Sequence, residues 1–233
     1  ELSPEEINKV AEENFTNMGL IIIEFILLKK MNENNFRKII NFSIEGEEYL
    51  KEAYDRGKGV IIFTAHFGNW EWLGAILSYL GYPMTAIAKQ QHNKGFDQSI
   101  NKTRRKTGVK MIFTRKMSQR AAYTALKNKE CLYIIGEQYP VSNGWPVQFF
   151  GRSTLAFSGV VRFAEKSGAA IVPAFLVREG WRKYRLVIHQ SYLVEKGADL
   201  TVQEKVLQEL MGMVEKVIRE NLDQWLWAHE RWR

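Results

Sequence analysis

The sequence is poor in cysteine, in proline and in long apolar runs, and each shortage excludes a class of protein. A single cysteine, Cys131, excludes a disulfide framework and a zinc site built on cysteine. Five prolines and 17 glycines leave no room for a low-complexity linker. The most apolar run, 18–28, is interrupted by Glu24 and is shorter than the roughly 20 residues that span a bilayer. We therefore expect a buried or interfacial helix there.

What remains has the composition of a globular protein. Hydrophobic residues make up 45% and charged residues 25%, which excludes a disordered chain, a collagen and a coiled coil. A length of 233 residues fits one large domain. We predict a single domain over 1–233, in which N-terminal helices over about 1–57 pack on an α/β core over about 58–233.

Short apolar, β-branched runs alternate with helical patterns in the second part of the chain. Strands are predicted at residues 59–64, 84–88, 111–113, 131–135, 170–177 and 185–189. Helices are predicted at residues 70–80, 94–107, 118–127, 157–167 and 201–221, with a loop-rich segment over 137–155. This alternation predicts an α/β fold with a mostly parallel central sheet covered by helices on both faces. In such sheets the ligand binds at the carboxyl ends of the strands.

Charge is unevenly distributed along the chain, whose formal net charge is +7. Residues 1–55 carry twelve acids and six bases, whereas residues 89–120 carry ten bases against the single acid Asp97. A basic block implies an anionic partner such as phosphate, a membrane surface or nucleic acid, and a solvated face is the alternative. We expect no nucleic acid, because no known binding motif and no interleaved aromatic side chains accompany the charge.

A histidine and an acid follow the first strand of the predicted sheet, in the sequence Thr-Ala-His-Phe-Gly-Asn-Trp-Glu over 64–71. A turn at Gly68 would let His66 fold back toward Glu71 in the first turn of the next helix, which Asn69 can cap. A neutral histidine held by a carboxylate is a general base. With no serine or cysteine nucleophile nearby, its target would be a substrate such as an alcohol. A structural histidine and a dipole-stabilising acid are the alternative.

Sequence blocks spaced along the whole chain are similar to those of one family. The blocks are His66–Glu71, Arg104–Gly108, Gly136–Gln138, Pro146–Arg152, Ala170–Pro173 and Trp225–Arg231. In this order they resemble the bacterial lipid A biosynthesis (lauroyl/myristoyl) acyltransferases, within the lysophospholipid/glycerolipid acyltransferase superfamily.

The resemblance implies that a fatty acyl chain moves from an acyl thioester, on acyl carrier protein or coenzyme A, to a hydroxyl of a membrane lipid or glycolipid. A lipid A-type acceptor is favoured. His66 would remove the hydroxyl proton with support from Glu71, and Glu137, which follows a buried strand, could compete for the supporting role. We expect no cofactor beyond the thioester co-substrate and no metal. The resemblance also implies an anionic membrane surface at the cytoplasmic face of the bacterial inner membrane, reached through a helix upstream of Glu1.

Other residues are predicted to bind substrate. Guanidinium groups hold phosphate through paired hydrogen bonds, which favours arginines of the basic block and one beyond it. The predicted substrate-binding residues are Asn69, Arg104, Arg105, Arg115, Arg120 and Arg152.

The sequence also departs from the family pattern. Lys89-Gln90 stands where many members have Arg-Pro, and Glu137 replaces the commoner Asp. These departures leave the acceptor open, so a phosphatidylinositol-mannoside-type acyltransferase remains an alternative. Thioester hydrolysis and a non-catalytic peripheral lipid-binding protein are the others. The Trp-rich tail over 225–232 suits either a membrane interface or packing under the last helix.

Overall fold

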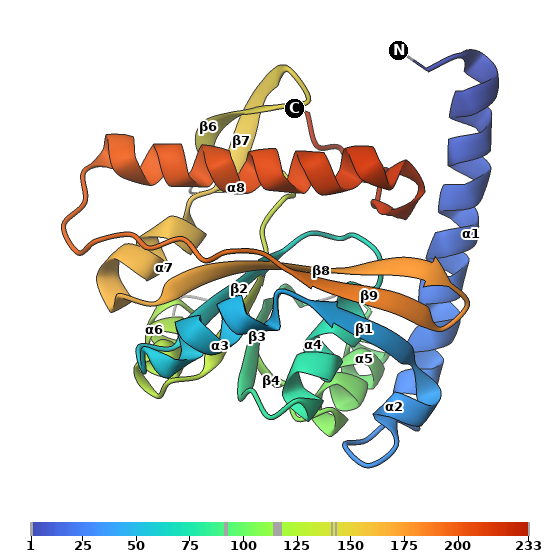
Figure 1. The fold of residues 1–233 in the computed structure, drawn as a ribbon, viewed down its shortest axis with the longest axis horizontal. Helices are drawn as coiled ribbons and strands as arrows, with labels where there is room; N and C mark the ends of the chain where they lie inside the picture. Colours follow the sequence, from blue (N-terminus) through green and yellow to red (C-terminus); the bar gives the residue numbers. More distant parts are fainter. Residues whose placement is uncertain (1, 91–92, 114–117, 141, 143, 233) are drawn as a thin grey trace.

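The computed structural model describes residues 2–90, 93–113, 118–140, 142 and 144–232 (Figure 1). The strands are β1 (Asn41–Glu45), β2 (Val60–Thr64), β3 (Met84–Ala88), β4 (Lys110–Phe113), β5 (Cys131–Ile135), β6 (Gly144–Phe149), β7 (Arg152–Phe157), β8 (Ala170–Gly180) and β9 (Lys183–Ile188). The helices are α1 (Pro4–Leu28), α2 (Phe36–Ile39), α3 (Glu47–Asp55), α4 (Trp70–Tyr79), α5 (Lys94–Lys106), α6 (Ser118–Lys127), α7 (Gly159–Ser167), α8 (Leu200–Glu220) and a 3-10 turn, η1 (Leu222–Gln224).

Seven of the described strands form one sheet in the order β1-β9-β8-β2-β5-β3-β4. β8 and β9 pair antiparallel, and the other neighbours in this sheet pair parallel. The predicted α/β class with a mostly parallel central sheet is therefore confirmed. β2 lies at the centre because its residues Val-Ile-Ile-Phe-Thr are buried on both faces, as expected of a parallel strand that helices cover on two sides.

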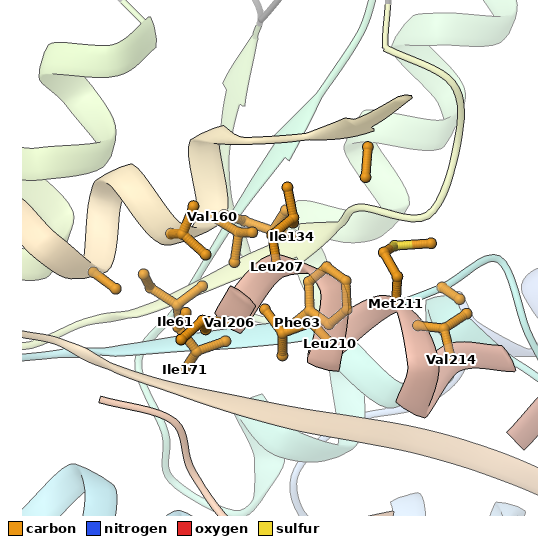
Figure 2. Packing of buried hydrophobic residues seen from close by; sticks show 14 of the residues in the cluster. Ile61, Phe63, Ile134, Val160, Ile171, Val206, Leu207, Leu210, Met211 and Val214 are labelled. Atoms are coloured by element: carbon orange, nitrogen blue, oxygen red, sulfur yellow. The ribbon is translucent and has the colours of Figure 1, made fainter. Parts of the chain in front are cut away.

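Helices cover both faces of this sheet. On one face, side chains of α6, α7 and α8 pack against β2, β5 and β8. Figure 2 shows part of this core, where Leu207, Leu210 and Met211 of α8 lie near Phe63 of β2 and Ile134 of β5. On the other face, α3 and α4 bury their apolar side chains against the same strands.

Helix α1 runs along one end of the molecule (Figure 1). It begins with a capping box, in which the Ser3 hydroxyl accepts from the Glu6 amide and the Glu6 carboxylate accepts from the Ser3 amide. Its inner face buries Glu24 and Leu28, whereas the apolar residues Phe15 and Ile22 on its outer face stay exposed. Within the described residues, no helix combines the length and the apolar composition that crossing a bilayer requires.

One correction concerns the N-terminal segment. Residues 41–45 lie inside the segment over about 1–57 in which only helices are predicted, but they form the edge strand β1, which pairs parallel to β9. Burial alternates along β1 and leaves only Phe42 and Ile44 partly covered, so the apolar pattern is too short to predict a strand. The sheet therefore includes a strand from before residue 58.

A second correction concerns residues 137–155, which were expected to be loop-rich. They contain β6 and most of β7, an antiparallel hairpin that lies over α8 (Figure 1). Its two-residue turn, Phe150-Gly151, has φ of 54° and 72°, the geometry for which Asn-Gly or Asp-Gly is the usual signal. Pro146 inside the first strand weakens the strand pattern further. β7 also includes Phe157, so α7 begins two residues later than predicted.

Candidate active site

A pocket of about 430 Å³ lies at the carboxyl ends of β3 and β5, beside the start of β4 and between α4 and α5. This is the edge of the sheet at which a ligand is expected. One part of its lining carries polar groups, which are those of His66, Glu71, Lys89, Arg104, Tyr133 and Gln138. Most of the rest is apolar and comes from Leu28, Trp70, Gly74, Ala86, Ile87, Ala88, Val109, Met111, Ile134, Ile135 and Phe157. The pocket thus places ionisable side chains beside a hydrocarbon surface.

The turn that carries His66 is held from several sides. Gly68 has φ of +55°, and a Cβ atom added there would lie 1.8 Å from the carbonyl oxygen of Leu176, so only glycine fits this position. The carbonyl oxygen of His66 accepts a hydrogen bond from the amide of Leu226, at 2.9 Å, in the C-terminal segment. These contacts fix the backbone at His66 and just after it.

His66 is paired with Glu137, which lies just after β5. Nδ1 of His66 is 2.8 Å from Oε1 of Glu137, and the two side chains are 22% and 1% exposed. The imidazole ring also packs in a T-shaped arrangement with the Trp70 ring, with 5.1 Å between ring centroids. Because Nδ1 is engaged with the carboxylate, Nε2 is the ring nitrogen that can take a proton from a bound group.

Glu71 has a different partner from the one predicted. Its two carboxylate oxygens accept from Nε and Nη2 of Arg104 in α5, at 3.0 and 2.5 Å. This paired geometry is the strongest arrangement of an arginine and a carboxylate. The prediction that Glu71 directly supports His66 is therefore wrong in this structure, because the Arg104 guanidinium occupies both of its oxygens. Glu71 acts on His66 through its charge.

The environment shifts the pKa of both members of the His66–Glu137 pair. Burial lowers the pKa of His66, but the charge and hydrogen bond of Glu137, together with the charge of Glu71, outweigh it and raise that pKa above its ordinary value. Burial raises the pKa of Glu137, but the His66 charge and hydrogen bond outweigh it, so the net pKa is lowered. The pair therefore favours an ionised carboxylate beside a histidine with increased basicity.

A comparison with protein families decides the class to which this arrangement belongs. The model of the bacterial lipid A biosynthesis acyltransferases matches residues 1–233. The chain belongs to that family. It is therefore an acyltransferase, as the order of its sequence blocks predicts.

Individual relatives are similar to this acyltransferase over much of its length. The lipid A biosynthesis palmitoleoyltransferase of Escherichia coli (strain K12) is 26% identical over 237 residues, which cover 99% of this chain and 74% of that protein. A phosphatidylinositol mannoside acyltransferase of Mycobacterium tuberculosis (strain CDC 1551 / Oshkosh) is 24% identical over 161 residues, 67% of this chain and 51% of that protein.

Among solved structures, this acyltransferase aligns with the crystal structure of the 1-acyl-sn-glycerophosphate (LPA) acyltransferase PlsC from Thermotoga maritima. The TM-score is 0.48 at 15% identity, and the alignment covers 83% of this chain and 79% of that chain.

The structure separates the remaining predicted site residues of this acyltransferase. Asn69 is fully buried, caps α4 by accepting from the Trp72 amide at 2.9 Å, and donates to Glu24 at 2.8 Å. Both polar ends of the Asn69 side chain are thus used inside the protein, and this predicted substrate contact does not line the pocket. Of the predicted arginines, Arg104 lines the pocket. Three others are exposed and lie outside it, namely Arg105, Arg120 and Arg152. Arg115 lies outside the described residues.

Sequence reasoning missed several residues at the pocket. Tyr133 on β5 lines it and donates from its hydroxyl to the carbonyl oxygen of Trp70 at 2.8 Å. Lys89 follows β3 directly, so its position after a predicted strand is a signal that could have identified it. Among the described residues, no three His, Cys, Asp or Glu side chains come together in a way that could hold a metal ion.

The tryptophan tail follows the packing alternative for most of its length. Trp225 is buried and lies in an aromatic cluster with Phe149, Phe150 and Trp232 under the β6–β7 hairpin. Trp227 packs on Trp225 but remains partly exposed. The tail therefore fixes the hairpin and the His66 turn to each other.

Proposed function

We propose that this acyltransferase moves a fatty acyl chain from an acyl thioester to a hydroxyl group of a lipid A-type acceptor, with His66 as general base. The observation that carries the proposal is the His66–Glu137 pair, which opens on a pocket lined mostly by apolar side chains. An apolar wall suits an acyl chain, and a base beside it suits activation of a hydroxyl group.

The proposed reaction needs no covalent enzyme intermediate and no cofactor beyond the thioester. The acceptor hydroxyl gives its proton to Nε2 of His66 while its oxygen attacks the thioester carbonyl carbon. The tetrahedral intermediate then collapses, the carbon–sulfur bond breaks, and the leaving thiolate takes the proton from the imidazolium. Glu137 holds the ring through Nδ1 and stabilises the imidazolium while it exists.

Positive groups at the polar part of the pocket would serve the anionic parts of the reaction. Arg104 and Lys89 both line it, and Glu71 holds the Arg104 side chain in place. In this proposal, Arg104 and Lys89 bind the substrate phosphate or stabilise the oxyanion of the intermediate, since positioned donors of this kind stabilise such charge. The exposed arginines 105, 120 and 152 are proposed to contact an anionic membrane surface, at the cytoplasmic face of the bacterial inner membrane.

A second acceptor class is supported by one observation. The similarity to phosphatidylinositol mannoside acyltransferases covers two thirds of this chain. A phosphatidylinositol-mannoside-type acceptor is therefore the alternative to lipid A, with the same base and the same donor chemistry.

Mass spectrometry of a detergent reaction tests the proposal. The protein is mixed with a series of acyl thioesters, on carrier protein and on coenzyme A, and with either a lipid A-type precursor or phosphatidylinositol mannosides. We expect one lipid to gain the mass of one acyl group, and we expect His66→Ala to abolish that gain. Free fatty acid without acylated lipid would instead indicate hydrolysis, and acylation that persists in His66→Ala would contradict the role of the base.

The pH dependence of the reaction follows from the raised pKa of His66. A general base must be neutral to accept a proton, so kcat/KM should rise with pH through the pKa of His66 in the free enzyme. Because that pKa is raised, we expect the midpoint of the acid limb above the ordinary value of 6.5. In Glu137→Gln the stabilising charge is gone, so the limb should move to lower pH as the remaining rate falls. Rates from pH 5 to 9 check both shifts; an acid limb below 6.5 in the wild type would contradict this arrangement.

A further inference from the structure

The C-terminal segment runs past both members of the catalytic pair. Near its start, the amide of Leu226 donates to the carbonyl oxygen of His66. Further on, Nε2 of His229 accepts from the amide of Tyr139, two residues after Glu137, at 3.3 Å. No residue of this segment takes part in the proposed reaction. However, the segment goes on to bury a charged side chain in the interior.

That side chain is Arg231, which is fully buried. Its Nη1 donates to the hydroxyl of Thr154 and to the carbonyl oxygen of Leu155, both at 2.8 Å, and its guanidinium lies over the ring of Phe149. Within the described part of the chain, its Nε and Nη2 are buried without a hydrogen-bond partner. A buried charge with neutral partners alone is costly, so an opposite charge is needed nearby.

Glu137, a buried acid, also has a side-chain atom without a hydrogen-bond partner. Its Oε1 is bonded to His66, while its Oε2 is buried without a hydrogen-bond partner among the described residues. Before the reaction His66 is neutral, because a base must be, so the imidazole supplies a hydrogen bond but no charge. Burial lowers the pKa of Arg231 to about 10, and the attraction of Glu137 opposes this effect. Arg231 therefore remains charged at neutral pH.

We propose that Arg231 is a positioning residue of the active site, the permanent buried countercharge that balances the Glu137 carboxylate while His66 is neutral. In the resting enzyme the Arg231 cation balances the Glu137 anion. When His66 takes the substrate proton, the carboxylate is already ionised and aligned to stabilise the imidazolium. This inference rests on the proposed role of His66 as general base.

Other charged or titratable groups act on the same pair and stay in place in the test. Glu71 of α4 and Arg104 of α5 contribute opposite charges to His66. Tyr133 of β5 feels the charge of Glu137, and Tyr139, after β5, acts on Arg231. Lys89 and His229 complete the surroundings at the end of β3 and in the C-terminal segment. None of these groups is changed in the variants below.

A pH profile of kcat/KM separates the countercharge from a structural role. In Arg231→Gln the unbalanced Glu137 charge would stabilise the imidazolium more strongly, so the acid limb should move to higher pH. A shift of about one pH unit corresponds to an about tenfold loss of kcat/KM at a fixed pH on that limb. Arg231→Lys keeps the charge and should keep the limb near its wild-type position. A folded Arg231→Gln enzyme with an unshifted limb would overturn the proposal.

Thr154→Val is the matched control for the tail's anchoring. It removes both hydrogen bonds between Thr154 and Arg231, in which the Thr154 hydroxyl accepts from Nη1 and donates to the Arg231 carbonyl oxygen, and it leaves the arginine charge intact. The acid limb should stay where it is in the wild type. A shift in Thr154→Val equal to that in Arg231→Gln would assign the effect to the tail's position and overturn the role of the charge.

Thermal unfolding tests the pairing without any substrate. Each single variant, Glu137→Gln or Arg231→Gln, leaves one buried charge without its counterpart, whereas the double variant removes both charges. We expect the double variant to lose less Tm than the two single losses combined. Additive losses would overturn the pairing even if acyl transfer is observed, and a non-additive cycle would stand even if the proposed acceptor proves wrong.

Discussion

Replacing His66 by alanine should lower kcat/KM for acyl transfer by about 10²–10⁴-fold, the range usual for a general base. The expectation rests on the ring's position at the pocket, with Nδ1 held by Glu137. Glu137→Gln should approach the same loss, because it removes the charge that stabilises the imidazolium. Initial rates of thioester consumption and of lipid product formation, measured in parallel, give both values.

Glu71→Gln is the matched comparison for Glu137→Gln, since both replace a glutamate near His66. Glu71 is bonded to Arg104 instead of the histidine, so its loss should act mainly on substrate binding and leave more of kcat. Because His66 and Glu137 act as a unit, the double variant His66→Ala with Glu137→Gln should be little slower than His66→Ala alone. An inactive Glu71→Gln beside an active Glu137→Gln would reverse the assignment of the two carboxylates.

The position of His66 could be predicted because its signals are local. An apolar run of five residues predicts the buried strand before it, and Gly68 and Asn69 predict the turn and the start of the next helix. The rule that ligands bind at the carboxyl ends of parallel strands then indicates the site. All of these local signals lie within residues 60–69, close to the histidine in the sequence.

The partner of His66 could not be chosen in the same way. Glu71 is near in sequence, but Arg104 reaches it from α5, and Glu137 reaches His66 from the end of the neighbouring strand β5. Which carboxylate meets the histidine is decided by strand order and by a competing guanidinium, and neither is visible in the spacing. The same reason explains why Asn69, a predicted substrate contact, turns inward toward Glu24.

The structural role of Glu24 could not be predicted from the sequence, where this residue only interrupts an apolar run. In the fold it is fully buried, and its carboxylate accepts two hydrogen bonds from Arg178, both at 2.7 Å. It also accepts from the Tyr184 hydroxyl at 2.6 Å and from Asn69 at 2.8 Å. One carboxylate thus joins α1 to β8, to β9 and to the residue that caps α4.

Glu24→Ala should destabilise the protein by about 3–5 kcal/mol, the cost of removing one partner of a buried ion pair. Arg178 would remain buried without its carboxylate, and the hydroxyl of Tyr184 and the amide of Asn69 would each lose an acceptor. For a chain of this size the loss corresponds to a Tm lower by about 6–20 °C. Thermal or urea unfolding followed by circular dichroism measures it. Asp55→Ala, at an exposed ion pair with Lys51, should leave the Tm close to that of the wild type.

The cause of that loss can be separated from simple loss of packing. If an unpaired buried charge is responsible, the double variant Glu24→Ala with Arg178→Met should recover part of the stability, because it removes the charge as well as its partner. A double variant less stable than Glu24→Ala would contradict this explanation.

Since Asn69 caps the helix that follows His66, Glu24→Ala should also lower kcat at temperatures where the variant is still folded, although Glu24 does not line the pocket. The seating of α1 would then contribute to how the general base is held.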